Sequence, residues 1–516
     1  MNKYFFLLLI LSILSVALST VSEPTKLDVQ LRSPNKKSQL DLGSSSDKKN
    51  KINNYKNTVQ DKIQRRGGVE EVPEGKMSMA ASIFNLSKNI IGGGMLALPA
   101  GMAAGKGTGW LSAVALVAAS GLGSAYTFYL IGKCAHYTKS PDFRTLWDRT
   151  LGESSSWLID WAFLTLMGGV SVMYSCFVGD LFGALGELVP GLPPALAARN
   201  PAMVLVSAAV LVPLCLLRDL SALGASSLAG LAAVLYTAAF VGLRLRDGSY
   251  AAPAGKFLVG LGDAVKPALA NVGGPLSLGL GCAVLVNMLA TAYMAHPNGV
   301  KFYNELERRS FPRFAAVVGA ANALASALYV FVMLAGFRTF GMNCQGLILN
   351  NYHGSADKLG TLARAATGVS ILTSYPFAFV AFRGSFVSIL KSYRAPSKAQ
   401  NEKGLLEKLG DAAAGIDTNN KTWTAVTLAL MAATTGVSLV TKDVGLVVSL
   451  LGSLLGAGII FSMPTAMYLC VLRQDKSIPR STNEVAALHL LALLGGLLAA
   501  GGTAVTLLDS FTDVFK

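Results

Sequence analysis

The chain has 516 residues, of which 52% are hydrophobic and only 14% are charged, and its mean hydropathy is +0.49. Soluble domains carry about 25% charged residues, so this composition excludes a soluble enzyme or binding domain as the bulk of the chain. The formal net charge of +15 reflects Lys and Arg in loops, and no aromatic-plus-basic module for nucleic acid accompanies it.

The first 77 residues predict a leader followed by a polar tail. Residues 1–21 hold an apolar run from Tyr4 to Leu18 and small residues suited to cleavage, which is typical of a signal peptide. Residues 22–77 are basic, rich in Ser, Lys and Asn, and predict disorder. A cleaved signal would leave this tail on the translocated side, against the orientation inferred below. Three interpretations stay open: a two-part plastid address, an uncleaved extra helix, or a wrongly predicted first exon.

Eleven apolar segments follow, each long enough to cross a bilayer, which takes about 20 residues. Their predicted bounds are 79–104, 109–133, 157–188, 201–217, 221–243, 275–296, 314–337, 362–390, 423–440, 443–471 and 485–508. Lys and Arg are most frequent in the loops that would be inside if the first span began at the cytoplasmic face, so we predict that orientation. One all-α membrane domain is expected over 78–510, with a C-terminal end at 511–516.

The first span carries the strongest functional signal. It places Gly92, Gly93 and Gly94 near its middle and Pro99 shortly after them. Each glycine weakens a helix by about 1 kcal/mol, and broken backbone survives in lipid only where protein or water receives the freed groups. A membrane helix that breaks at mid-depth is typical of a transporter binding site.

Four motifs in chain order resemble the amino acid/auxin permease family, and the resemblance covers about 78–510. The motifs are Asn85-Leu86-Ser87 with Ile91-Gly92-x-Gly94-x-Leu96-x-Leu98-Pro99; Val212-Pro213-Leu214 with Leu217-Arg218-Asp219-Leu220-Ser221-Ala222-Leu223; Ala292-Tyr293-Met294-Ala295-His296-Pro297-Asn298; and Phe340-Gly341 with Ile348-Leu349-Asn350 and Ser374-Tyr375-Pro376. The resemblance implies an APC-type (LeuT-like) fold of two inverted five-helix repeats plus one helix, with spans 1 and 6 broken. We expect the sixth span to break at His296-Pro297-Asn298.

A zwitterionic amino acid could bind where these two breaks meet. Freed backbone amides suit its carboxylate, and exposed carbonyls around Leu289 to Tyr293 suit its ammonium. Two tyrosines are candidates to close over its side chain, although packing or interfacial anchoring is the alternative for each. The predicted substrate-binding residues are Asn89, Gly92, Gly93, Gly94, Met95, Tyr174, Ala290 and Tyr293.

Ionisable and hydroxyl groups inside spans are candidates for ion coupling, because they are costly there. Lys88 lies one turn before the glycines, where sodium-coupled members of the family carry an Asn ligand, so it could fill an empty sodium position near Thr373 and Ser374. The alternative is that Lys88 reaches the cytoplasmic surface. His296 could carry a proton or cap a broken helix, and Asp180 could titrate or lie near the outer headgroups.

We therefore predict a monomeric secondary transporter of amino acids, of the neutral class, that works by alternating access. It would be coupled to H⁺ or to nothing, with Na⁺ coupling as an alternative and no organic cofactor, metal site or catalytic residue. A rival from another class is an amino acid sensor that signals to a soluble partner through its tail. The membrane is left open between the plasma membrane, a vacuole or lysosome, and a plastid envelope.

Overall fold

The computed structural model describes residues 72–105, 107–218, 226–259, 261–268, 274–279, 281–354, 356–392, 416 and 419–511. The predicted leader at 1–21 and the tail up to residue 71 lie outside the described residues, as do residues 512–516. Within the described ranges the chain forms helices and no strand, and extended pairing is limited to isolated bridges.

Nine helices in the described ranges are long and apolar enough to cross a membrane by length and composition. They are α5 (Trp110–Thr138), α7 (Ser156–Gly186), the run α9 (Arg199–Val206), η3 (Ser207–Leu211) and α10 (Val212–Leu216), α11 (Ser226–Asp247), α14 (Phe311–Phe340), α15 (Lys358–Ser392), α17 (Asn420–Val440), the run α18 (Val444–Leu451), η8 (Gly452–Gly456), η9 (Gly458–Ser462) and α19 (Met463–Gln474), and α20 (Thr482–Phe511). Each corresponds to one predicted span, with ends that differ by a few residues.

Predicted spans 1 and 6 are interrupted helices, which is why neither is among the nine. The first consists of α3 (Met79–Ile90), η1 (Gly93–Ala97) and α4 (Leu98–Ala103). The second consists of α12 (Gly281–Ala292), η6 (His296–Asn298) and α13 (Gly299–Glu305). Eleven membrane crossings therefore stay a prediction, made of nine continuous helices and two broken ones.

Contacts between helices repeat after a shift of five spans. α14 packs on α3 and α4 as α5 packs on α12 and α13, and α11 packs on α15 as α18 packs on α7. Successive membrane spans alternate in direction, so two spans five apart run in opposite directions. The two sets of five are therefore inverted copies in their contacts, as predicted, and α20 is the additional helix.

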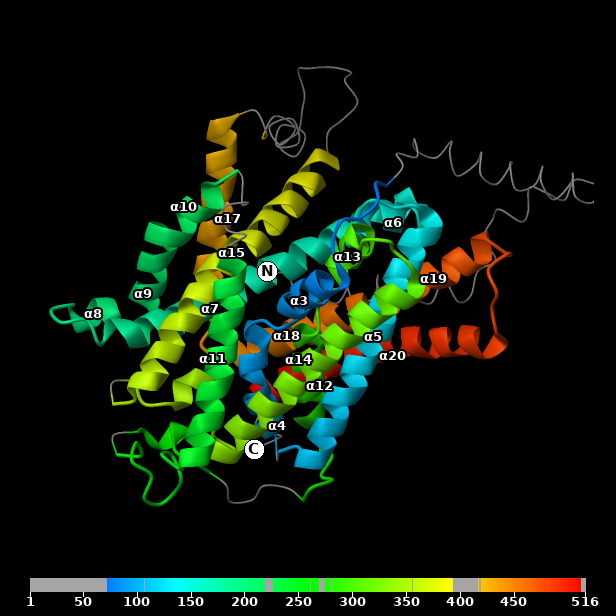
Figure 1. Cartoon of the computed structure of the whole chain (residues 1–516). Coiled ribbons are helices and arrows are strands. Elements are labelled where there is room, and N and C mark those ends of the chain that lie inside the picture. The colour runs from blue at the N-terminus through cyan, green and yellow to red at the C-terminus, as the bar shows by residue number, and fades with distance from the viewer. Residues whose placement is uncertain are drawn as a thin grey trace, which may run out of the picture.

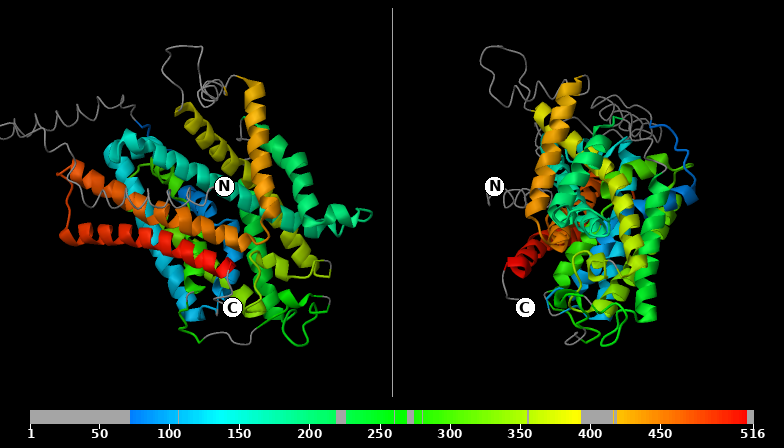
Figure 2. Two further views of the ribbon diagram at one scale, coloured as in Figure 1. Left: turned by 180° about the vertical axis from the view of Figure 1, so that it is seen from behind. Right: turned by 90° about the vertical axis from the view of Figure 1, so that its left-hand side faces the viewer.

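The broken helices lie in the middle of this bundle. Figure 1 shows α3, α4, α12 and α14 together at the centre, with α7, α11 and α15 on one side and α5, α19 and α20 on the other. Figure 2 shows α19 and α20 side by side at one edge, in agreement with their contacts. The core is thus built around the two breaks.

Inner and outer refer here to the predicted orientation, in which the first span begins at the cytoplasmic face. Residues 72–78, which we name the inner strap, pair with the end of α13 and the residues that follow it. The Met77 amide donates to the Glu305 carbonyl at 2.9 Å, and the Glu307 amide donates to the Met77 carbonyl at 2.9 Å. Arg309 donates to the carbonyls of Val72 at 2.9 Å and Pro73 at 3.1 Å. The strap therefore ties together the inner ends of the two interrupted helices.

Candidate functional site

The first interruption is a two-residue stretch of non-helical backbone. α3 ends at Ile90; Ile91 has φ −76° and ψ 93°, and Gly92 has φ −127° and ψ −165°. The first amides of a helix have no acceptor within it, and among the described residues no carbonyl accepts a hydrogen bond from Gly93 or Gly94. The predicted break of span 1 is confirmed, and the amides of Gly93 and Gly94 that follow it donate to no backbone carbonyl in the described ranges.

Glycine allows a close approach of η1 to its neighbours here. A Cβ on Gly94 would lie 3.3 Å from the Ala292 Cα, and a Cβ on Gly93 would lie 2.8 Å from the Phe177 Cε2. Gly94 therefore brings η1 against the last residue of α12. This contact places the break of span 1 beside the break of span 6.

The break of span 6 lies between the broken end predicted around Leu289 to Tyr293 and the helix-breaking residues His296-Pro297-Asn298. α12 ends at Ala292, Tyr293 to Ala295 are non-helical, and His296-Pro297-Asn298 form the short turn η6 that leads into α13. Proline is accommodated in the first turn of a helix, where its missing amide is not needed. The outer half thus ends within the predicted range of Leu289 to Tyr293, and Pro297 begins the inner half of the span.

Tyr329 on α14 joins the two breaks. Its hydroxyl lies 2.8 Å from the Ile90 carbonyl oxygen and 2.7 Å from the Ala292 carbonyl oxygen, and its side chain is fully buried. Ile90 and Ala292 are the last residues of α3 and α12. The carbonyls freed at both broken ends thus converge on one hydroxyl group.

The other predicted substrate-binding residues lie around this point in different settings. Met95 is fully buried, and Ala290 is buried against Gly456 of η8. Asn89 is exposed, and its Oδ1 accepts from Asn298 at 3.3 Å, which links α3 to η6. These residues line the junction of the interrupted helices from its core and from its inner side.

The two predicted tyrosines differ in their contacts. Tyr293 is buried, and its hydroxyl lies 2.6 Å from the Ser326 Oγ and donates to the Val117 carbonyl at 3.2 Å. These bonds match the packing alternative. Tyr174 is half-buried on α7, and its ring lies 6.4 Å from that of Tyr375. The Tyr174 hydroxyl makes no hydrogen bond within the described ranges, and its contact with a substrate stays a prediction.

His296 is fully buried at the start of the inner half of span 6. Its Nε2 lies 2.9 Å from the Thr127 Oγ1, and its Nδ1 has no partner among the described residues. The Thr127 hydroxyl donates to the Gly123 and Ser124 carbonyls, so it accepts from Nε2–H. Nδ1 then carries a lone pair that accepts no hydrogen bond, and burying such an acceptor costs free energy.

Lys88 shares the partly exposed face of α3 with Asn85 and Asn89, and it makes no ion pair within the described part of the chain. The predicted neighbours Thr373 and Ser374 lie on α15, which packs chiefly on α7 and α11, whereas α3 packs chiefly on α14. The Thr373 hydroxyl donates to carbonyls of its own helix. No hydrogen bond of the described residues brings Lys88 to this pair, so its occupation of a sodium position stays a prediction.

Asp180 is held by two polar side chains at the outer end of α7. Its Oδ1 accepts from Arg199 Nε at 2.5 Å, and its Oδ2 accepts from Asn350 at 3.1 Å. Asn350 belongs to η7 (Ile348–Asn351), a buried turn in the outer loop between α14 and α15. The Asp180 carboxylate thereby connects η7 to α7 and α9. This arrangement favours a structural role for Asp180 over uptake and release of a proton during transport.

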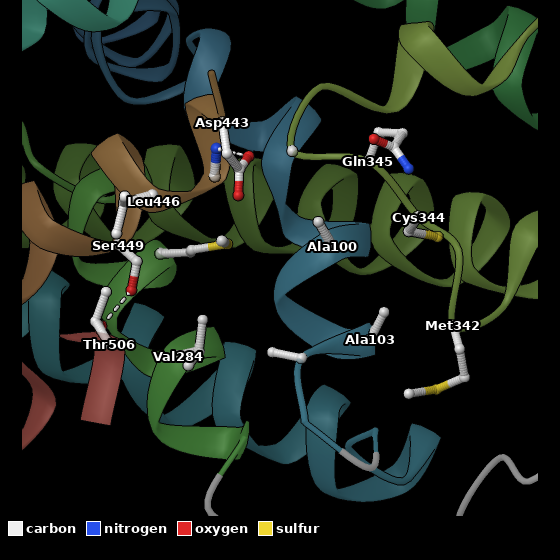
Figure 3. A pocket seen from close by; sticks show the side chains of 14 residues that line it. Ala100, Ala103, Val284, Met342, Cys344, Gln345, Asp443, Leu446, Ser449 and Thr506 are labelled. Atoms are coloured by element: carbon white, nitrogen blue, oxygen red, sulfur yellow. Dashed lines mark hydrogen bonds between the residues drawn. The ribbon is translucent and has the colours of Figure 1, made fainter. Parts of the chain in front are cut away.

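A cavity of about 220 Å³ lies outward of the breaks. Figure 3 shows Asp443, Ser449 and Thr506 on its left, Met342, Cys344 and Gln345 on its right, and Ala100 and Ala103 of α4 between them. None of the predicted site residues lines it. The cavity is therefore separate from the junction of the breaks.

Two functional contacts escaped sequence reasoning. Tyr329 is one tyrosine in an apolar span, and only its hydroxyl, which needs a partner when buried, hinted at a role. Arg199 lies just before the predicted fourth span. Nothing in the sequence indicates that it forms an ion pair with Asp180.

Comparisons with known proteins identify the family of this chain. The family model described as transmembrane amino acid transporter protein matches residues 75–508. A Bos taurus protein that carries the provisional name sodium-coupled neutral amino acid transporter 11 is 23% identical over 425 residues, 82% of this chain and 82% of that protein. Vacuolar amino acid transporter 7 of Saccharomyces cerevisiae is 26% identical over 310 residues, 59% of this chain and 58% of that protein.

Among solved structures, MhsT in complex with L-phenylalanine is similar at a TM-score of 0.42 and 12% identity, over 85% of this chain and 99% of that chain. At that TM-score the likeness adds no argument about the fold, which rests on the helix contacts described above.

Proposed function

We propose that this multi-pass membrane protein, which belongs to the transmembrane amino acid transporter family, is a secondary transporter of neutral amino acids that works by alternating access. One observation carries the proposal: both interrupted helices present their breaks to each other, with Gly94 against Ala292 and Tyr329 bonded to both broken ends. Interrupted helices that meet at mid-membrane are the usual binding site of secondary transporters.

The broken ends offer complementary charges to a zwitterion. The free amides of Gly93 and Gly94 stand at a helix N-terminus, which carries partial positive charge and suits a carboxylate. The carbonyls of Ile90 and Ala292 stand at helix C-termini, which carry partial negative charge and suit an ammonium. Such a site would recognise the two groups that all α-amino acids share, and we propose that Tyr174 of α7 contacts the side chain.

Coupling to protons is favoured by His296. A buried imidazole with one unpaired nitrogen can gain a proton when water reaches it, and it adjoins the break of span 6. The relatives' names point in different directions, since one is named for sodium coupling and another for a vacuole. We propose transport that does not require sodium, with His296 as the proton carrier.

Uptake into proteoliposomes tests the function. Purified protein would be reconstituted and offered a panel of labelled amino acids under a proton gradient alone and a sodium gradient alone. We expect accumulation of neutral amino acids with the proton gradient, unchanged when sodium is replaced by choline. Binding of an amino acid without accumulation under either gradient would favour the sensor alternative, and uptake that vanishes in choline would reject sodium independence.

A further inference from the structure

We propose that the Tyr329 hydroxyl takes the place of a bound cation between the broken ends of α3 and α12, so that the site is complete without sodium. The inference rests on the proposed function and deepens it, because it names the residue that removes the need for sodium. It makes Tyr329 a positioning residue that acts through the backbone of both interrupted helices.

The Tyr329 hydroxyl lies within hydrogen-bond distance of one carbonyl from each broken end, the position that a bridging cation would take. The Tyr329 oxygen lies 2.8 Å from the Ile90 carbonyl and 2.7 Å from the Ala292 carbonyl. All three residues are buried, with Tyr329 fully so. The Tyr293 ring packs edge-on against the Tyr329 ring at 5.0 Å, which fixes the position of the hydroxyl.

Electrostatics explains why something positive belongs there. The last carbonyls of a helix lack amide partners and carry about half a negative charge at the end of the helix dipole. α3 and α12 both end at this point, so two such ends face each other in the core. In broken-helix transporters, ends of this kind coordinate Na⁺ or H⁺. Here the polarised hydrogen of one hydroxyl, shared between two carbonyls, supplies the positive charge.

The Tyr329 hydroxyl does not use up the hydrogen-bonding capacity of the two carbonyls. A carbonyl oxygen has two lone pairs, and Tyr329 engages one on each of the two carbonyls. The second lone pairs stay available for an ammonium group. Tyr329 would therefore hold the two broken ends at a fixed separation in every cycle, as a bound ion would, without having to bind and leave.

Replacing the hydroxyl should restore the need for an ion. In Tyr329→Phe the two carbonyls lose their donor while the ring still fills the space beside Tyr293. The melting temperature of the purified protein would be measured in choline chloride and in sodium chloride at equal ionic strength. We expect no sodium effect on the wild type, a lower melting temperature for Tyr329→Phe in choline, and saturable recovery in sodium. Uptake by the variant should fall about tenfold in choline and recover in sodium.

Tyr293→Phe is the matched control. It removes a buried hydroxyl from the neighbouring ring, but that hydroxyl bonds to Ser326 and Val117 instead of to the broken ends. Its melting temperature should fall without any recovery in sodium. A sodium response of equal size in both variants would show a general salt effect and overturn the proposal.

Two other results would also overturn it. One is a saturable sodium stabilisation of the wild type, since the position would then hold an ion beside Tyr329. The other is a Tyr329→Phe protein that sodium does not restore, or that fails to fold in sodium as well as in choline, since the vacated position would then not be one for a cation. The melting measurement does not depend on uptake, so a wild type that moves no amino acid would reject the function and leave this result standing.

Discussion

His296 Nε2 lies 2.9 Å from Thr127 Oγ1, and this bond joins the start of the inner half of span 6 to the middle of α5. Because the Thr127 hydroxyl already donates to its own helix, the imidazole must donate to it through Nε2. Nδ1 is then unprotonated and accepts no hydrogen bond in the described ranges. The side chain therefore has one nitrogen for anchoring and one for a proton.

We expect His296→Gln to lose proton-driven accumulation. A glutamine amide can still donate to Thr127, but it has no nitrogen that takes up a proton. Uptake driven by a pH gradient should fall to the level seen without a gradient, while exchange of amino acids across the membrane persists. His136→Gln is the control, since His136 is exposed and bonds to the Tyr303 hydroxyl at the inner end of α5. Full gradient-driven uptake by His296→Gln would assign the proton to another group.

Gly94→Val should separate the two breaks. Even a Cβ at this position comes within 3.3 Å of the Ala292 Cα, and the valine methyl groups need more room. Forcing added carbon into a packed core costs about 1–3 kcal/mol, and we expect uptake to fall at least about tenfold at a normal amount of folded protein. Gly319→Ala on α14, with nothing within 4 Å of its added Cβ, should transport like the wild type. Normal uptake by Gly94→Val would mean that the breaks need not touch.

Asp180→Asn should weaken the fold and spare the transport cycle. Removing one partner of a buried ion pair costs about 3–5 kcal/mol, with the lower figure expected because a quarter of the Arg199 side chain is exposed. The measurement is the melting temperature together with uptake per folded molecule across pH. The double change Asp180→Leu with Arg199→Met should regain much of the stability. A stable Asp180→Asn protein with an altered pH profile would instead make Asp180 a titrating group of the cycle.

Lys88→Gln tests the two interpretations of this lysine. Its side chain lies on the partly exposed, polar face of α3 and has no acidic partner among the described residues. A lysine whose ammonium reaches water contributes little, so we expect uptake close to that of the wild type in both sodium and choline. Loss of uptake, or a new dependence on sodium, would place Lys88 in an ion position beside Thr373 and Ser374.

The spans and the first break could be predicted because their signals are local. About 20 apolar residues fix a span, and Gly92 to Gly94 weaken the helix that holds them wherever it lies. The broken end of span 6 was predicted around Leu289 to Tyr293, where α12 ends, but the role of Pro297 was open, because proline can begin a helix as well as end one. The sequence does not distinguish these two uses.

Contacts between spans could not be predicted in the same way. Tyr329 meets Ile90 and Ala292 from positions far away in the chain, and Asp180 meets Asn350 across 170 residues. No spacing or composition encodes such a pair. The two interrupted helices could therefore be predicted from the sequence, while the Tyr329 hydroxyl that joins their ends came only from the structure.

The inner strap gives the transport cycle a mechanical constraint. Helix α3 begins directly after a segment whose amides and carbonyls are shared with the residues that follow α13, so the inner halves of the two broken spans cannot swing apart unless those bonds open, at about 1 kcal/mol each. Helices α3 and α13 should therefore move together as one unit during the transport cycle.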